Sequence, residues 1–188
     1  MIRRVLLAML AAASVAAPAV ADPDRPLTMP TRDVDVTYRA GQGDHVVVQR
    51  SRWSVDVRKM RLDTPTPGVY MIVDYEAKTL AMVSDPVHGV LDLQAPAAGL
   101  PGQAASSSAV YARRGSGQVA GIPCTEWETM DTQGQATLAC FTDDGVLLEA
   151  RRGGQVLVQA TRVAYGNLDA SAFVVPPSYR HETPRNNR

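Results

Sequence analysis

The chain has 188 residues, with 19 basic and 19 acidic side chains and 45% hydrophobic residues. This length is enough for one domain with a sizeable core. Such an even charge balance gives no indication of nucleic-acid binding or of a strongly acidic substrate, and we expect no nucleic-acid partner.

The first 21 residues have the three parts of a cleavable signal peptide. A basic start, MIRR, precedes the apolar VLLAMLAAASVAAPAV, and Ala19-Val20-Ala21 supplies the small-x-small cleavage site. The apolar run is rich in alanine and is interrupted by Pro18, unlike a membrane span of about 20 strongly apolar residues. We therefore expect cleavage after Ala21, a periplasmic location, and a mature chain of 167 residues without a transmembrane segment.

The sequence after the signal peptide divides into three segments. Residues 22–31 are expected to be a flexible N-terminal segment, residues 32–179 a single β-rich domain, and residues 180–188 a disordered polar tail. Inside the domain, the stretch 94–108, QAPAAGLPGQAASSS, has no periodicity and little bulk, which is typical of a long loop.

Most of the domain alternates apolar and polar residues, which indicates half-buried β-strands. DVDVTYR is the first such stretch, and HVVVQRS and RWSVDVRK follow it. GVYMIVDYEAKTLAMVSD indicates a hairpin joined around Glu76-Ala77-Lys78. Alternation resumes after the long loop, with turns expected at DDG and RGGQ and a last strand at SAFVVP. The nine to eleven expected strands, with little helix, predict a mainly β, antiparallel and curved sheet or barrel.

The densest basic run includes Arg50, Arg52 and Arg58, which alternation places together on the solvent face of their strands. One interpretation is a patch that meets anionic lipid headgroups or an acidic partner. The other, which we favour, is a charged strand that resists pairing at the edge of a sheet.

Cys124 and Cys140 are the only cysteines in the sequence. In an exported protein, two cysteines most simply form one disulfide. The three histidines are scattered and no CxxC or HxxxH occurs, so no metal site is predicted. The wide spacing in strand-like sequence also argues against a redox pair that opens a helix. If Cys124 and Cys140 lie directly opposite each other in a hairpin, the two strands are joined by a loop of three or five residues centred on Thr132, unless the ladder contains a bulge.

No motif indicates catalysis. Gly115, Gly117 and Gly121 lack the spacing of a phosphate-binding loop, and no G-x-S-x-G sequence occurs. Asp143 and Asp144 precede Gly145 between two expected strands, which is typical of a turn rather than of a carboxylate pair. We therefore expect a protein that is not an enzyme and that uses neither a cofactor nor a metal.

Apolar residues occupy both faces of VYMIVDY and TLAMVSD. A sheet with a second layer would have this pattern, and so would an open barrel that holds a hydrophobic ligand. The scarcity of helices to cover an inner face favours the cavity. Alternation then suggests seven ligand-lining residues: Trp53, Val55, Val57, Tyr70, Ile72, Met82 and Leu91.

Several stretches in order along the chain resemble one family: VDVTYRA, GVYMIVDYEAKTLAMVSD, VAGIPCTEW, ACFTDDGVLLEAR and YGNLDASAFVVPPSY. They are similar to a group of uncharacterised exported proteobacterial proteins of unknown function, placed near the LolA/LolB-like outer-membrane lipoprotein carriers. The resemblance covers nearly all of residues 32–179.

This resemblance implies an unclosed antiparallel β-barrel with helices or loops over its concave side. In the carriers that hollow takes acyl chains, which implies a lipid or a lipoprotein acyl chain as the ligand here, in envelope lipid or lipoprotein handling. The alternative expectation is a module with a filled core and no small ligand, which docks to an envelope protein.

Overall fold

The computed structural model describes residues 25–41, 43, 45–94, 110–130 and 134–183. The expected signal peptide and residues 95–108 of the expected loop lie outside these ranges. The described elements are twelve strands and two short 3-10 helices: β1 (Val34–Ala40), β2 (Val47–Ser54), β3 (Lys59–Asp63), β4 (Val69–Asp74), β5 (Thr79–Ser84), η1 (Asp85–Val87), β6 (Gly89–Gln94), β7 (Tyr111–Val119), β8 (Ile122–Met130), β9 (Ala136–Phe141), β10 (Leu147–Arg152), β11 (Gln155–Tyr165), η2 (Ala170–Phe173) and β12 (Arg180–Glu182).

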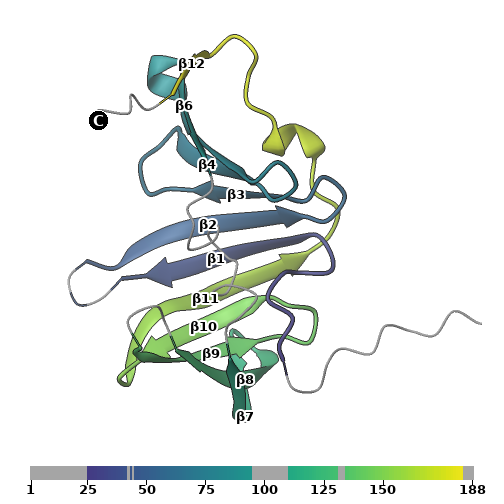
Figure 1. The fold of residues 1–188 in the computed structure, drawn as a ribbon, viewed down its shortest axis with the longest axis vertical. Helices are drawn as coiled ribbons and strands as arrows, with labels where there is room; N and C mark the ends of the chain where they lie inside the picture. The colour runs from purple at the N-terminus through teal and green to yellow at the C-terminus, as the bar shows by residue number, and fades with distance from the viewer. Residues whose placement is uncertain (1–24, 42, 44, 95–109, 131–133, 184–188) are drawn as a thin grey trace, which may run out of the picture.

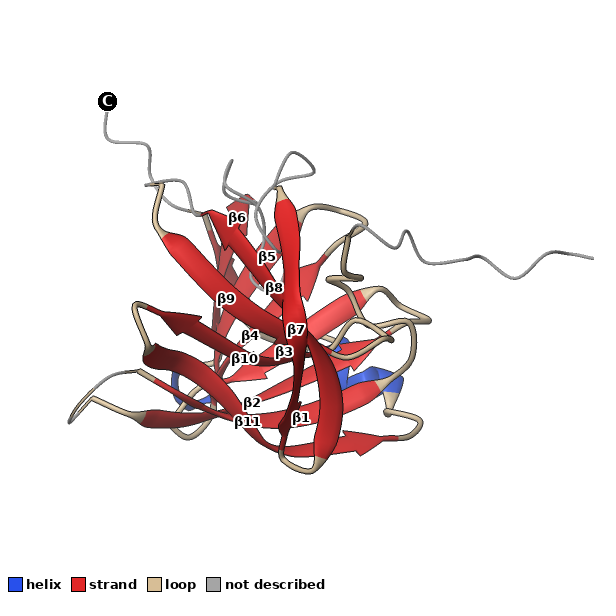
Figure 2. Ribbon diagram, turned by 90° about the horizontal axis from the view of Figure 1, so that it is seen from below, coloured by secondary structure: helices blue, strands red, loops and turns tan. Residues whose placement is uncertain are grey.

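All of these strands form one sheet, in the order β12-β6-β5-β4-β3-β2-β1-β11-β10-β9-β8-β7 (Figure 1). Neighbours are antiparallel except β12 and β6, which are parallel. The sheet curls strongly, so that β7 and β8 cross the direction of β1 and β11 (Figure 2). The two edge strands, β7 and β12, do not pair with each other. The predicted mainly β, antiparallel, strongly curved and unclosed fold is confirmed, with twelve strands instead of nine to eleven.

Three stretches differ from the sequence expectations. The SAFVVP stretch is wrong as a strand, because Ala170–Phe173 is a 3-10 helix that Asp169 caps by accepting a hydrogen bond from Ser171 N. Residues 180–182, expected in the tail, form β12 along β6. RWSVDVRK is not one strand: β2 ends at Ser54 and the chain turns at 55–58 before β3.

The basic run does not lie at a sheet edge, because β2 pairs with both β1 and β3. Our interpretation of the run as an edge strand is therefore wrong. Arg50 Nε donates to both carboxylate oxygens of Asp35, at 2.9 and 3.1 Å. Arg52 and Arg61 both bind Asp63, at 2.5 and 2.8 Å. These ion pairs, two between strands and one within β3, pair three arginines of the run with two carboxylates on one face of the sheet, called here the outer face.

The disulfide joins Cys124 of β8 to Cys140 of β9, with Cα atoms 5.5 Å apart. Met130 pairs with Ala136, so five residues join the strands, one of the two predicted lengths. The predicted centre is wrong, however, because Cys140 faces Glu126 and the two cysteines are diagonal neighbours. Diagonal Cα atoms in a flat pair are about 7–8 Å apart, so the short distance reflects strong local coiling.

The core lies on both faces of the sheet. The larger cluster includes Val34, Trp53 and Met60 on the face called here the inner face. On the outer face of β4 to β6, a second cluster is formed by Tyr70, Ile72, Val83 and Val90, with Val175 and Tyr179 packed against it.

The C-terminal segment after β11 covers this second cluster. Figure 1 shows the segment running from β11 past η2 to β12 on the opposite part of the sheet. Arg61 Nη1 donates to Ala172 O at 3.1 Å, Tyr179 OH donates to Asp85 Oδ1 at 3.0 Å, and Arg180 N donates to His88 O at 2.8 Å. The apolar residues on the outer face of β4 and β5 are therefore buried by this segment.

Candidate functional site

The candidate site is a pocket on the inner face of β1, β2 and β3. Because side chains alternate along a strand, every second residue of these strands points to this face. The register aligns them in cross-strand rows: Val34 with Trp53 and Met60, Val36 with Ser51 and Leu62, and Tyr38 with Gln49. The pocket has a volume of about 280 Å³.

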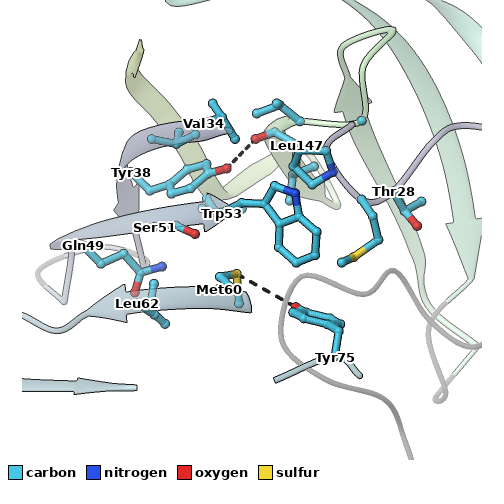
Figure 3. A pocket seen from close by; sticks show the side chains of 16 residues that line it. Thr28, Val34, Tyr38, Gln49, Ser51, Trp53, Met60, Leu62, Tyr75 and Leu147 are labelled. Atoms are coloured by element: carbon cyan, nitrogen blue, oxygen red, sulfur yellow. Dashed lines mark hydrogen bonds between the residues drawn. The ribbon is translucent and has the colours of Figure 1, made fainter. Parts of the chain in front are cut away.

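The wall opposite these strands comes from two segments far apart in the sequence. Thr28, Met29 and Pro30 of the N-terminal segment form one part, and residues 145–147 at the start of β10 form the other. The two are in backbone contact, because Thr31 N donates to Asp144 O at 3.0 Å. Tyr38 OH donates to Leu147 O at 2.7 Å and so joins this wall to β1 (Figure 3).

Asp144 anchors the N-terminal segment. Its carboxylate accepts hydrogen bonds from Thr142 Oγ1 at 2.5 Å, Arg32 Nε at 2.6 Å and Tyr165 OH at 3.2 Å. Burial acts to raise the pKa of Asp144, but these hydrogen bonds outweigh it and lower the pKa. Asp144 is therefore ionised at neutral pH and holds Arg32, whose guanidinium also lies 3.6 Å over the Tyr165 ring.

The deep end of the pocket is aromatic and apolar. Trp53 and Tyr75 pack edge to face, with ring centroids 5.2 Å apart, and Tyr75 OH lies 4.0 Å from Met60 Sδ. All three side chains are buried. Burial also raises the pKa of Tyr38 and of Tyr75, so both phenols are neutral at physiological pH. A lining of aromatic rings with a flexible methionine is suited to an apolar chain.

The structure brings together only some of the seven residues suggested from alternation. Trp53 lines the pocket. Met82 and Leu91 face each other on β5 and β6, in the cross-strand row that continues from Leu62 through Met71 on the inner face. Met82 is 40% exposed, so this row is open to solvent.

The other four residues lie elsewhere. Tyr70 and Ile72 are buried on the outer face beneath the C-terminal segment. Val55 and Val57 lie in the turn between β2 and β3. Ligand contact by any of the seven residues stays a prediction.

Sequence reasoning missed the wall formed by Thr28, Met29, Pro30 and residues 145–147. The first three fall in the segment expected to be flexible, and no local pattern links them to the DDG turn. One signal was present in Gly145. It has a φ of 91°, and a Cβ there would lie 2.3 Å from Met29 O. A glycine that follows two aspartates is equally typical of an ordinary turn, so its close contact was not predictable.

Among the described residues, no group of three or more His, Cys, Asp or Glu side chains is arranged to hold a metal ion. In the same part of the chain, no helix has the length and apolar character needed to cross a bilayer.

No family model and no curated protein matches the chain, so the family suggested by the sequence stays a prediction. Solved structures do match. An uncharacterized conserved protein from Thermus thermophilus superposes with a TM-score of 0.60 at 12% identity, over 82% of this chain and 91% of that chain. MucB in complex with MucA(peri) superposes with a TM-score of 0.51 at 15% identity, over 80% of this chain and 56% of that chain. The MucA/MucB complex from Pseudomonas aeruginosa gives 0.51 at 17% identity, over 77% and 55%.

The likeness is one of fold. At these identities the shared feature is the curved sheet, and this chain spans little more than half the length of each MucB chain.

Proposed function

We propose that the protein is an exported, non-catalytic binding protein of the periplasm that takes a lipid or another apolar ligand into the inner-face pocket. The observation that carries this proposal is a pocket with an aromatic, apolar deep end and no acidic or basic side chain among its described lining residues. The buried disulfide supports an oxidising compartment. A role in envelope lipid or lipoprotein handling follows from that location and ligand class.

The size of the pocket restricts the ligand. Ligand pockets usually measure about 300–1,000 Å³, and this one, at about 280 Å³, lies just below that range. It is therefore suited to one short chain and not to several chains together. A longer chain would continue along the partly exposed row of Leu62, Met71, Met82 and Leu91.

A fluorescence titration with N-phenyl-1-naphthylamine, which brightens in apolar sites, tests the proposal. Val158 lines the pocket and is only partly exposed, whereas Val156 on the same strand is 39% exposed and does not line it. We expect the mature wild-type protein to bind the dye. Val158→Trp should weaken binding at least about tenfold, which is roughly 1.4 kcal/mol. The matched control Val156→Trp should bind like wild type.

Native mass spectrometry of mature protein purified from its own periplasm tests the ligand class directly. A co-purifying lipid that is released on denaturation would support the proposal. A wild-type protein that neither carries a lipid nor binds the dye would refute it, as would equal dye binding by the two tryptophan variants when circular dichroism shows that both are folded.

A second candidate is a protein-interaction module. The small volume of the pocket and the exposed Met82 favour it, since a partner's apolar side chain could occupy this surface. The similarity to MucB, which was crystallised with MucA, points in the same direction. This candidate predicts no dye binding, and a photo-crosslinker in place of Met82 should capture one protein of defined mass in the periplasm.

A further inference from the structure

The described lining of the pocket lacks charge because the strands that build it send their charged residues to the outer face. On β2, Gln49, Ser51 and Trp53 point inward, while Arg50 and Arg52 alternate with them and bind Asp35 and Asp63 outside. The sixteen lining residues within the described chain include no lysine, arginine, histidine, aspartate or glutamate.

The pocket also has a polarity gradient along β2. Its deep end, at Trp53, is buried, whereas Gln49 and Ser51 are partly exposed. In Figure 3 these two residues lie on the Tyr38 side of the pocket, and Trp53, Met60 and Tyr75 lie toward the other side.

Gln49 and Ser51 are free to bind a ligand. The Tyr38 hydroxyl already donates its hydrogen bond to Leu147 O. Neither Gln49 nor Ser51 makes a side-chain hydrogen bond to any described part of the chain. A carboxamide and a hydroxyl can both donate and accept, and two residues along a strand separate them by roughly 7 Å.

We propose that the pocket selects a single-chain amphiphile with an uncharged carbonyl head group, an amide or an ester. This inference rests on the proposed function and names its ligand class. The chain lies toward Trp53, Met60 and Tyr75, and the head group exchanges hydrogen bonds with Gln49 and Ser51. A free carboxylate or phosphate is disfavoured, because a partly buried anion without a cationic partner loses hydration that nothing replaces.

Displacement of N-phenyl-1-naphthylamine by three ten-carbon ligands tests this selectivity. Decanamide and methyl decanoate carry neutral head groups, and decanoate is an anion at pH 7.5. We expect the two neutral ligands to displace the dye at concentrations at least about tenfold lower than decanoate, equivalent to roughly 1.4 kcal/mol. Gln49→Leu and Ser51→Ala should reduce this preference without abolishing dye binding.

A charge-introducing pair of variants gives a positive test. Gln49→Lys places a cation at the Gln49 end of the pocket and should improve decanoate binding relative to decanamide. Val48→Lys adds the same charge on the outer face of β2, where Val48 is 59% exposed, and should leave the preference unchanged.

The outcomes separate the two proposals. If the dye binds and decanoate displaces it as well as decanamide, the head-group inference is overturned and the proposed function stands. The inference is also overturned if Gln49→Lys and Val48→Lys act alike. If wild-type protein does not bind the dye at all, both proposals fail.

Discussion

Replacing Cys124 and Cys140 together by alanine measures what the disulfide contributes to stability. The bond closes a loop with a sequence separation of 16, for which the chain-entropy model gives about 3 kcal/mol. Both cysteines are almost fully buried, at 5% and 3% exposed. Loss of one buried heavy atom from each side chain adds about 1 kcal/mol or less per site, by analogy with Ile to Val changes. The expected loss is therefore about 4–5 kcal/mol, or a fall in Tm of roughly 10–20 °C for a domain of this size.

Thermal and urea unfolding of the mature protein, followed by circular dichroism, measures this loss. Wild-type protein treated with a reductant serves as a second comparison, since it keeps both sulfur atoms and should lose about 3 kcal/mol only. Dye binding at a temperature where the variant remains folded should be unchanged, because neither cysteine lines the pocket. A loss below about 1 kcal/mol, or loss of dye binding at unchanged stability, would refute a purely structural role.

Three further substitutions test other parts of the structure. Tyr38→Phe should cost about 1 kcal/mol at pH 8 by removing a partly buried hydrogen bond. Burial raises the pKa of Tyr38, so the native side chain keeps its proton above pH 10, where the tyrosine of the unfolded chain ionises. Wild-type stability therefore falls in that range by about 1.4 kcal/mol per pH unit because of this residue. Urea unfolding at pH 8 and pH 11 should show that the variant lacks this component. Hydrogen bonding by Arg50 lowers the pKa of Asp35, and Asp35→Asn should cost about 1 kcal/mol at pH 7 because Arg50 is half exposed. The stability difference from wild type should shrink as the pH falls below 3.8. Persistence of the full difference in acid would contradict the ion pair. Gly145→Ala should lower the free energy of unfolding by at least about 2 kcal/mol, because the backbone there is left-handed and the added Cβ would meet the N-terminal segment. Gly153→Ala, with open space around it, should lower it by about 1 kcal/mol. Equal Tm values for the two variants would argue against the contact at Gly145.

Alternation predicts which side chains a strand can bury, and for β1 this was sufficient. Val34, Val36 and Tyr38 share the inner face as DVDVTYR indicates. The same reasoning failed after Ser54, because alternation continues to Val57 although the chain turns there. The turn is fixed by the pairing of β2 with β3 across the four residues 55–58, with Trp53 opposite Met60, and no proline or glycine in that stretch marks the turn.

The candidate site was only partly predictable because segments that are distant in sequence cover it. The apolar residues on both faces of β4 fitted either a second layer or an open cavity, and they did not indicate what covers each face. Tyr70 and Ile72 are buried by Val175 and Tyr179, about a hundred residues further along the chain. The wall at Met29 likewise depends on contact with Gly145. A pattern read within one strand cannot assign a face to a pocket when the covering segment is distant in sequence.

The place of β1 in the sheet has a consequence for how the protein folds. β1 is the first strand in the chain, yet it lies in the middle of the sheet between β2 and β11. Its pairing with β2 spans a short connection, but Val34 pairs with Tyr165 across most of the domain. Pairing over such a separation is intrinsically slow, and β1 keeps an open edge until β11 arrives. A chain that crosses a membrane unfolded with its N-terminus first would therefore expose that edge to self-association until its last third has followed, which makes this the interval when a chaperone would matter most.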